Sequence, residues 1–324
     1  SSWVRIERLG YALPPPDGIN GGDSKYDIYI RSQIHKGVAI AESLYAVEPY
    51  YYGYTSWIGI IRGPFSDNFT HPYSMFERLR ALVAHEFHHA CQIRYRDITR
   101  ASDVWIHENT STYIEHIVFP EVNILPYRLS TAMNPLDSPF LQINPDFIGQ
   151  EPMAYSGGIL PVFLHEKYGS SIVRSIWEWL GTATSVEILS GINEVLKTST
   201  SSTDSLSTAI KAYAIWRYFT GPLRADTIHY FKDGKLYPAS LIDSLHDFFP
   251  VGTTIGVHEI SKTGGTSYIQ FQNVSNDSVY FSLNFNGETN PYWNALIVRL
   301  RNGFPPIKDE IQLSSNSQGS KTFV

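Results

Sequence analysis

Several features are scarce in this chain of 324 residues, and each scarcity excludes a class of protein. Cys91 is the only cysteine, so no disulfide can form within the chain. No apolar run approaches the length of about 18 residues that marks a candidate membrane-spanning helix. The net charge is −6, which gives no electrostatic footprint for nucleic acid or an anionic membrane. We therefore expect a soluble globular protein without a nucleic-acid partner.

The start of the chain lacks both a methionine and a basic-then-apolar leader, since it opens Ser1-Ser2-Trp3. Such a start is expected of a processed protein or of a trimmed chain, and either would hide a signal peptide. Few cysteines together with many serine, threonine and aromatic residues suit a bacterial exported protein. We therefore expect a secreted or extracytoplasmic location.

The most informative segment present is His85-Glu86-Phe87-His88-His89, inside a helical pattern that predicts a helix over residues 74–95. Residues four apart share a helix face, so His85 and His89 can present two imidazole nitrogens to one metal ion. Glu86 then lies beside that ion, which is the arrangement of a catalytic zinc site. The core-facing stripe of this helix is expected to comprise Phe76, Leu79, Val83, Phe87 and Ala90.

Two neighbours of this motif could compete as ligands. His88 stands three residues from His85, but that pairing would turn the metal away from Glu86, so we interpret His88 as a packing residue. Cys91 lies two residues past His89 and points about 200° away from it around the helix. We expect Cys91 to be a small buried residue, as free cysteines usually are.

A second helix, expected over residues 103–118 behind a cap at Ser102 or Asp103, supplies acidic candidates. Glu108 and Glu115 share one stripe of this helix with Trp105 and Thr112. A catalytic zinc usually keeps three protein ligands and one open position for water. Glu108 is therefore the expected third ligand.

These residues resemble a known family. His85-Glu86-x-x-His89, followed after eighteen residues by Glu108, is similar to the gluzincin clan, which includes thermolysin and the aminopeptidase N family. The stretch Met153-Ala154-Tyr155-Ser156-Gly157-Gly158 resembles the aminopeptidase N segment in which a tyrosine stabilises the transition state. Residues 21–30 and 213–218 are also similar to a family of secreted bacterial proteins classed as metalloproteases. The resemblance covers most of the chain, but only its zinc motifs are sharp.

Some positions depart from the family pattern. Asn109 and Ser111 stand where gluzincins often have Gly and Ala, a change that spares every expected ligand. The Gly-x-Met-Glu-Asn strand with which the aminopeptidases capture a free amine has no counterpart between Ala39 and Ser74. An endopeptidase is therefore favoured over an aminopeptidase. A di-iron centre would need a second Glu-x-x-His, and none occurs.

The resemblance implies metal-assisted hydrolysis of peptide bonds. Zn²⁺ held by His85, His89 and Glu108 would lower the pKa of its bound water, and Glu86 would act as general base. Tyr155 would hydrogen-bond the developing oxyanion, and Glu115 would orient a ligand histidine through its other ring nitrogen. The alternatives for these two residues are an ordinary core or surface tyrosine and a solvated helix carboxylate.

The organisation of the chain is expected to be α+β, followed by an all-β part. Strands are expected at residues 26–30 and 56–61, and the resemblance implies that their sheet lies beside the zinc helix and aligns substrate along its edge. Further helices are expected at 154–168, 170–180, 184–197 and 204–219. We expect a gluzincin-like peptidase domain over residues 1–249.

The pattern changes from Pro250, where short alternating runs separated by Asn, Asp and Gly turns replace the helices. Strands are expected at 267–271, 279–285 and 295–300. We expect residues 250–324 to form a small β-sandwich-like domain, whose role is packing or, as the lesser alternative, binding of substrate or carbohydrate.

The sequence thus favours a monomeric zinc metallopeptidase that acts on peptides or proteins. Two other functions remain open: a secreted binding or adhesion protein on the same scaffold, and a zinc hydrolase of non-peptide amides or esters. Glu86 discriminates against the first, because a structural zinc needs ligands but no general base beside an open position.

Overall fold

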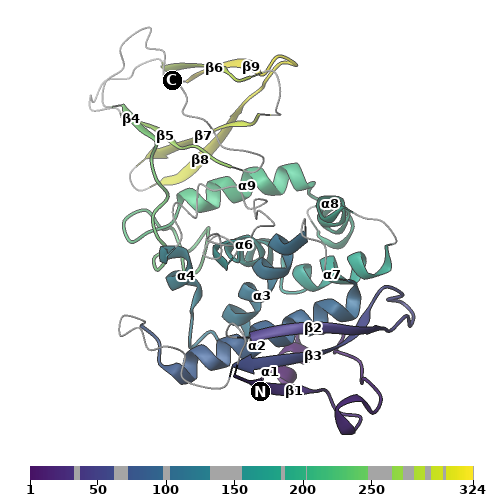
Figure 1. The fold of residues 1–324 in the computed structure, drawn as a ribbon. Coiled ribbons are helices and arrows are strands. Elements are labelled where there is room, and N and C mark those ends of the chain that lie inside the picture. Colours follow the sequence, from purple (N-terminus) through teal and green to yellow (C-terminus); the bar gives the residue numbers. More distant parts are fainter. Residues whose placement is uncertain are drawn as a thin grey trace.

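The computed structural model describes residues 1–32, 37–61, 72–97, 103–131, 155–183, 187–201, 203–246, 265–272, 281–288, 293–301 and 304–323. Over these residues the chain is mixed α+β (Figure 1). A small sheet packs against the long helix α2, a helical middle follows, and small β-sheets form the C-terminal part. The expectation of α+β structure followed by an all-β part is confirmed at this level.

The N-terminal sheet has the strand order β1-β3-β2. Strands β1 (Ile28–Arg31) and β3 (Tyr54–Ile61) are parallel, whereas β2 (Gly37–Leu44) runs antiparallel to β3 and forms an edge of the described sheet. Ile58 and Ile60 are two residues apart on β3, so their side chains lie on the same face of the sheet. This face meets α2, and both side chains are buried there. The strands expected at 26–30 and 56–61 correspond to β1 and β3. The sequence did not indicate β2, because its alanine and glutamate residues have weak strand preference.

Helix α2 (Met75–Tyr95) is the central element of the domain. Ser74 and Glu77 form a capping box, in which each side chain accepts a hydrogen bond from the backbone N–H of the other residue. Every residue from Ala84 to Tyr95 is buried, because the sheet, α3 and other helices surround this half of the helix. The expected core stripe is wrong at its start: Phe76 is 65% exposed, since the first turns extend beyond these neighbours.

The helical middle contains the helices that the sequence predicts, together with others. Helices α3 (Val104–Val118), α7 (Ile172–Thr182), α8 (Ile188–Ser199) and α9 (Leu206–Tyr218) lie within a few residues of the expected bounds. The helix expected at 154–168 is interrupted, because Gly157 and Gly158 form a turn before α6 (Ile159–Tyr168). The short helices α1 (Ser2–Arg8) and α4 (Leu125–Thr131) were not expected.

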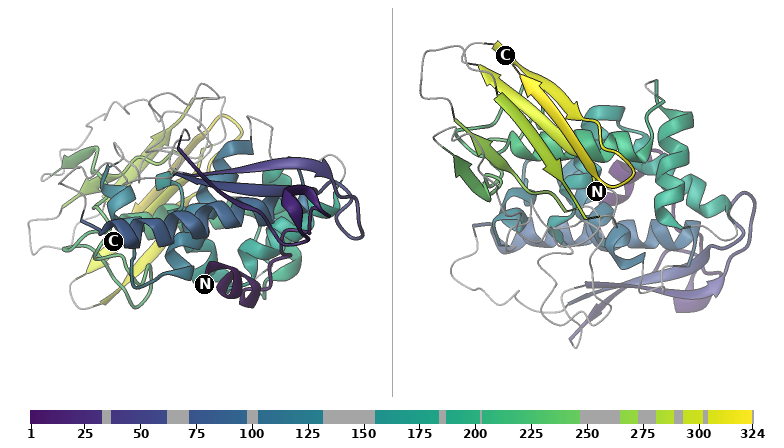
Figure 2. Two further views of the ribbon diagram at one scale, coloured as in Figure 1. Left: turned by 60° about the horizontal axis from the view of Figure 1, so that its bottom comes forward. Right: turned by 90° about the horizontal axis from the view of Figure 1, so that it is seen from above.

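The C-terminal part consists of paired strands on the α9 side of the helices, whereas the β1-β3-β2 sheet lies on the opposite side (Figures 1 and 2). β4 (Ser244–His246) pairs in parallel with β5 (Ile269–Phe271). Two antiparallel pairs follow: β6 (Phe281–Asn286) with β9 (Gln318–Phe323), and β7 (Ala295–Arg301) with β8 (Phe304–Ile311). The expected boundary at residues 249 and 250 lies outside the described residues. None of the described helices has the length and apolar character needed to cross a membrane.

Candidate metal centre

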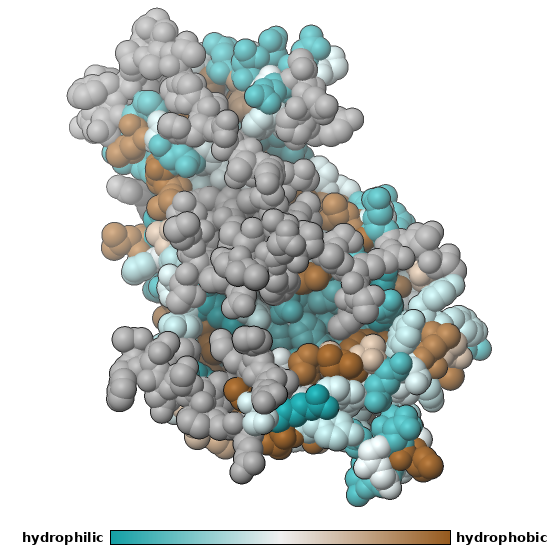
Figure 3. All heavy atoms as spheres, viewed as in Figure 1, coloured by the Kyte–Doolittle hydropathy of each residue, from teal (hydrophilic) through white to brown (hydrophobic). Residues whose placement is uncertain are grey.

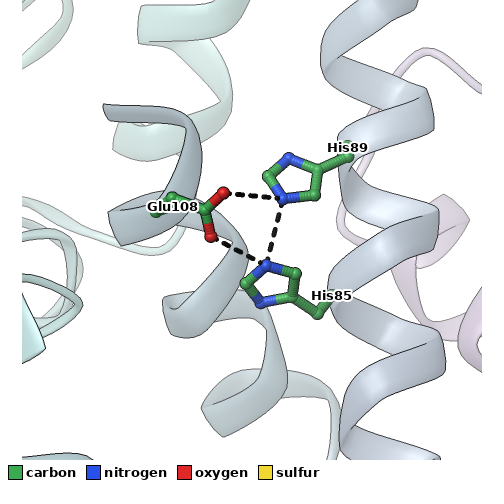
Figure 4. Close-up of side chains that lie close together, drawn as sticks. All are labelled: His85, His89 and Glu108. Carbon is green, nitrogen blue, oxygen red and sulfur yellow. Dashed lines mark hydrogen bonds and ion pairs between the residues drawn. The ribbon is translucent and has the colours of Figure 1, made fainter. Parts of the chain in front are cut away.

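Three side chains from two neighbouring helices converge where α2 packs against α3 (Figure 4). His85 and His89 lie one turn apart on α2, and Glu108 faces them from α3. The two Nε2 atoms are 3.0 Å apart, Oε2 of Glu108 is 3.1 Å from His85 Nε2, and its Oε1 is 3.6 Å from His89 Nε2. The structure therefore brings together the three residues that the sequence proposed as ligands.

The spacing of these atoms fits a zinc ion. Tetrahedral ligands at zinc bond lengths of about 2.0–2.1 Å are separated by about 3.3 Å. The three observed separations, 3.0, 3.1 and 3.6 Å, bracket that value. His85, His89 and Glu108 are the one group of at least three metal-ligating side chains with this closeness among the described residues.

Hydrogen bonds on the far side of each imidazole determine which ring nitrogen can act as a ligand atom. Nδ1 of His85 is 2.7 Å from Oε1 of Glu115, and Nδ1 of His89 is 2.7 Å from Oε1 of Gln92. Both partners are acceptors, so both Nδ1 atoms carry the proton and both Nε2 atoms present lone pairs. Two lone pairs and a carboxylate thus face one another, and only protons or a metal ion can bridge them.

The pKa shifts of His85 and Glu108 indicate which group carries a proton in the absence of a metal. Burial lowers the pKa of His85, but the hydrogen bonds to Glu108 and Glu115 outweigh burial and raise the pKa to about 10. Burial raises the pKa of Glu108, but the neighbouring His89 and His85 bring it well below its ordinary value. Without a metal, the site therefore holds a proton on His85 opposite an ionised Glu108. A divalent cation would take the place of that proton.

Glu115 is the partner of His85 and is itself held by a cation. Its side chain is fully buried and accepts hydrogen bonds from Arg128 Nη2 at 2.7 and 2.9 Å and from Arg128 Nε at 3.2 Å. Burial raises the pKa of Glu115, but Arg128 and His85 more than offset this and lower it. The alternative of a solvated helix carboxylate is therefore wrong, because Glu115 is buried between an arginine and a candidate ligand.

Glu86 lies beside the three converging side chains and is also buried. Burial raises the pKa of Glu86, whereas His85 and His89 lower it in part. Its carboxylate lies against the first residue of β2: a Cβ atom built on Gly37 would stand 2.6 Å from Oε1 of Glu86. A carboxylate with a raised pKa is suited to accept and return a proton near neutral pH.

Tyr155 reaches the same region from the segment that precedes α6. Its ring centroid is 5.7 Å from that of His85, and the guanidinium of Arg128 lies 4.4 Å from the centroid of the Tyr155 ring. Burial raises the pKa of Tyr155 well above its ordinary value, so the hydroxyl keeps its proton and can donate it in a hydrogen bond.

Two glycines let the Tyr155 segment approach α3 closely. A Cβ on Gly158 would contact the side chain of Thr112, and a Cβ on Gly157 would overlap the amide of Asn109. Asn109 is buried, directly after Glu108. The Asn109 side chain is therefore accommodated by a glycine in the facing segment.

His88 belongs to a buried polar layer rather than to the group of converging ligands. Its Nδ1 is 2.9 Å from Oγ of Ser111 and 3.0 Å from Nε2 of Gln92, and its ring meets that of Tyr11 edge-on. Burial lowers the pKa of His88 far below its ordinary value, so this imidazole stays neutral. Cys91 is fully buried, and burial raises the pKa of its thiol.

The surface near β2 has an apolar part and a polar part. In Figure 3, hydrophobic atoms lie along this strand, and hydrophilic atoms lie between it and the helical middle. Ile40 of β2 is 38% exposed, which is consistent with an apolar strip beside the polar band.

Comparisons of the chain with protein-family models, with curated proteins and with solved structures find no match. The geometry of the site is therefore the basis for its function.

Sequence reasoning missed four residues that shape the site: Gly37, Gln92, Arg128 and, as a packing position, Gly157. Gln92 had one detectable signal, because it stands three residues after His89 and seven after His85 on the same helix. Gly37 and Arg128 gave no signal, since their partners are far away in the sequence.

Proposed function

We propose that this protein is a zinc-dependent peptidase, most similar in its design to the gluzincins. The observation that carries the proposal is the convergence of two imidazole lone pairs and one carboxylate, with Glu86 next to them. A closed structural zinc site needs ligands but no general base beside an open coordination position, whereas a hydrolytic site needs a base there.

His85, His89 and Glu108 would hold the ion, which when bound supplies Lewis-acid polarisation of water and of the scissile carbonyl. Glu86 would accept a proton from the attacking water and deliver it to the leaving amine. The Tyr155 hydroxyl would donate a hydrogen bond to the oxygen on which negative charge develops. Glu115 would keep the proton of His85 on Nδ1, so that Nε2 remains available as a ligand atom.

The finer properties of the enzyme belong to the same proposal. An extended peptide would lie along the edge of β2, which runs past Glu86, and this favours cleavage within a chain. We propose a secreted, monomeric endopeptidase in which residues 1–249 form the catalytic domain. Residues 250–324 would form a sandwich-like accessory domain.

The test is peptide-bond hydrolysis on an unbiased peptide library, with the metal content of each sample determined in parallel. Wild-type protein loaded with zinc is expected to cleave, and Glu86→Gln is expected to bind zinc equally well but to lose the activity. This pair isolates the base, because the amide keeps the shape of the side chain. Stoichiometric zinc without cleavage by the wild type would contradict the peptidase assignment and favour a binding protein or a non-peptide substrate. Absence of bound metal would overturn the whole proposal.

A further inference from the structure

Gln92 lies at the centre of the buried polar layer between α2 and α3 and is fully buried. One end of its amide faces two imidazoles: Oε1 is 2.7 Å from Nδ1 of His89 and 3.3 Å from Nδ1 of His107. The other end faces three oxygen atoms and a ring nitrogen. Nε2 is 3.0 Å from the backbone oxygen of His107, 2.9 Å from Thr110 Oγ1, 3.1 Å from Ser111 Oγ and 3.0 Å from His88 Nδ1.

The backbone carbonyl of His107 fixes the orientation of the amide. A carbonyl oxygen can only accept a hydrogen bond, so the group that faces it must be the NH₂ of Gln92. Turning the amide over would place two oxygen atoms 3.0 Å apart in a buried site, which costs the full penalty of an unsatisfied group. The oxygen of the amide therefore faces His89.

The orientation of the amide in turn fixes the proton on His89. An amide oxygen accepts but cannot donate, so Nδ1 of His89 must be the protonated nitrogen and Nε2 must carry the lone pair. Gln92 thus hydrogen-bonds both the backbone oxygen of His107, the residue before Glu108, and the imidazole of His89. Two candidate ligands on different helices are tied together by one side chain.

We infer that Gln92 is a positioning residue of the metal centre, which holds His89 in the ligand tautomer and fixes its ring relative to Glu108. The inference rests on the metal centre of the proposed function. His85 has a charged partner, Glu115, that Arg128 neutralises, whereas His89 has a neutral partner. The amide therefore orients His89 without adding a further negative charge to the buried site.

The first experiment needs no substitution. In zinc-free protein with ¹⁵N-labelled histidine, where no metal ion sets the tautomer, NMR should show a proton on His89 Nδ1 that is protected from exchange with solvent. A His89 proton that exchanges as freely as that of an exposed imidazole would overturn the inference, and so would protonation at Nε2.

The second experiment measures zinc affinity by competition with a chelator. Gln92→Met keeps the length of the side chain and removes its hydrogen bonds, so affinity is expected to fall about 10–100-fold, as for other residues that orient ligands. Ser111→Ala is the matched control: its hydroxyl contacts Gln92 and lies 3.2 Å from His89 Nδ1, but the amide remains in place. Its affinity should change less than about threefold, a small fraction of the loss expected for Gln92→Met.

Equal affinity of Gln92→Met and wild type would overturn the inference, and an equal loss in Ser111→Ala would assign the role to the hydroxyl instead. The NMR experiment measures the tautomer of His89 and the competition experiment measures zinc affinity, so neither depends on turnover. A protein that binds zinc as expected but cleaves no peptide would therefore refute the proposed peptidase while the role of Gln92 stands. A Gln92→Met variant that fails to fold leaves the wild-type NMR result as the deciding one.

Discussion

The backbone of Gly37 lies directly against the carboxylate of Glu86, with no room for a side chain between them. Gly37 begins the edge strand β2, and Glu86 lies on α2 beside the candidate ligands. The contact places an edge strand of the sheet, as the described residues define it, next to the residue proposed as general base. It also means that one methyl group on β2 can displace that carboxylate without touching a ligand.

Gly37→Ala is therefore expected to lower the rate of peptide cleavage about 10–100-fold, because a shift of about 1 Å in a reacting group costs that much. Glu86 is flexible and can move aside, so the unfolding temperature and the zinc affinity should stay close to those of the wild type. The measurement is kcat and zinc affinity on the same samples. Val38→Ala serves as control, since the side chain of the next residue points to the other face of the sheet. Full activity in Gly37→Ala would show that this contact does not position the base.

Arg128 supports Glu115 through its hydrogen bonds and contacts the ring of Tyr155. Arg128→Met should leave the buried charge of Glu115 without its main cation. We expect a loss of about 2–3 kcal/mol in the free energy of unfolding, less than the roughly 3–5 kcal/mol of a fully buried pair because the Arg128 side chain is 22% exposed. Urea unfolding without zinc measures the loss.

Arg128→Met combined with Glu115→Gln should be more stable than Arg128→Met alone, because the second change removes the uncompensated charge. The zinc affinity of the double variant is expected to be lower than that of the wild type, since the amide of Gln is a weaker acceptor for His85 than a carboxylate. If the double variant were the less stable of the two, the charge argument would be wrong.

Asn109 and Gly157 are complementary in size across the contact between α3 and the Tyr155 segment. Gly157→Ala should cost about 1–3 kcal/mol in the free energy of unfolding, because the new methyl group overlaps the buried amide. Asn109→Ala in the same chain should recover most of this cost. The measurement is a double-mutant cycle by urea unfolding, and additive effects of the two substitutions would contradict the packing argument.

The buried histidines predict a dependence of stability on pH. Burial and the neighbouring His89 lower the pKa of His107 to about 3, and burial lowers that of His88 in the same direction. In the unfolded chain both imidazoles take up protons below about pH 6.5, whereas the folded protein keeps them neutral. The unfolded state then binds more protons, so stability is lost as the pH falls below about 6.5.

His107→Phe keeps a ring beside Trp177 and removes one of the two titrating groups. Between about pH 5 and 6, its free energy of unfolding should fall less steeply than that of the wild type, by about 1 kcal/mol per pH unit. Urea unfolding in the presence of a chelator checks this without interference from metal release. Parallel stability curves for the two proteins would show that His107 is protonated in the folded state.

Short-range patterns in the sequence were enough to predict the helices that carry the candidate ligands. The spacing of His85 and His89 places them on one face of a helix, and the helix expected over residues 74–95 corresponds to α2 (Met75–Tyr95). The stripe of α3 that contains Glu108 follows from the same periodicity. The strand β2 could not be predicted in this way, because pairing with β3 rather than local preference makes it a strand.

The sequence by itself determined that His85 and His89 share a helix face with Glu86 beside them, because helical periodicity is a local property and fixes the relative direction of nearby side chains. Only the tertiary structure decided how these residues are held. Gly37 meets Glu86, Gln92 reaches the backbone of His107, and Arg128 joins Glu115 to Tyr155, all across elements that are distant in the chain or on different helices. These contacts arise where α2 packs against β2 and α3 and where α4 packs against α3, and no local pattern encodes which side chains that packing brings together.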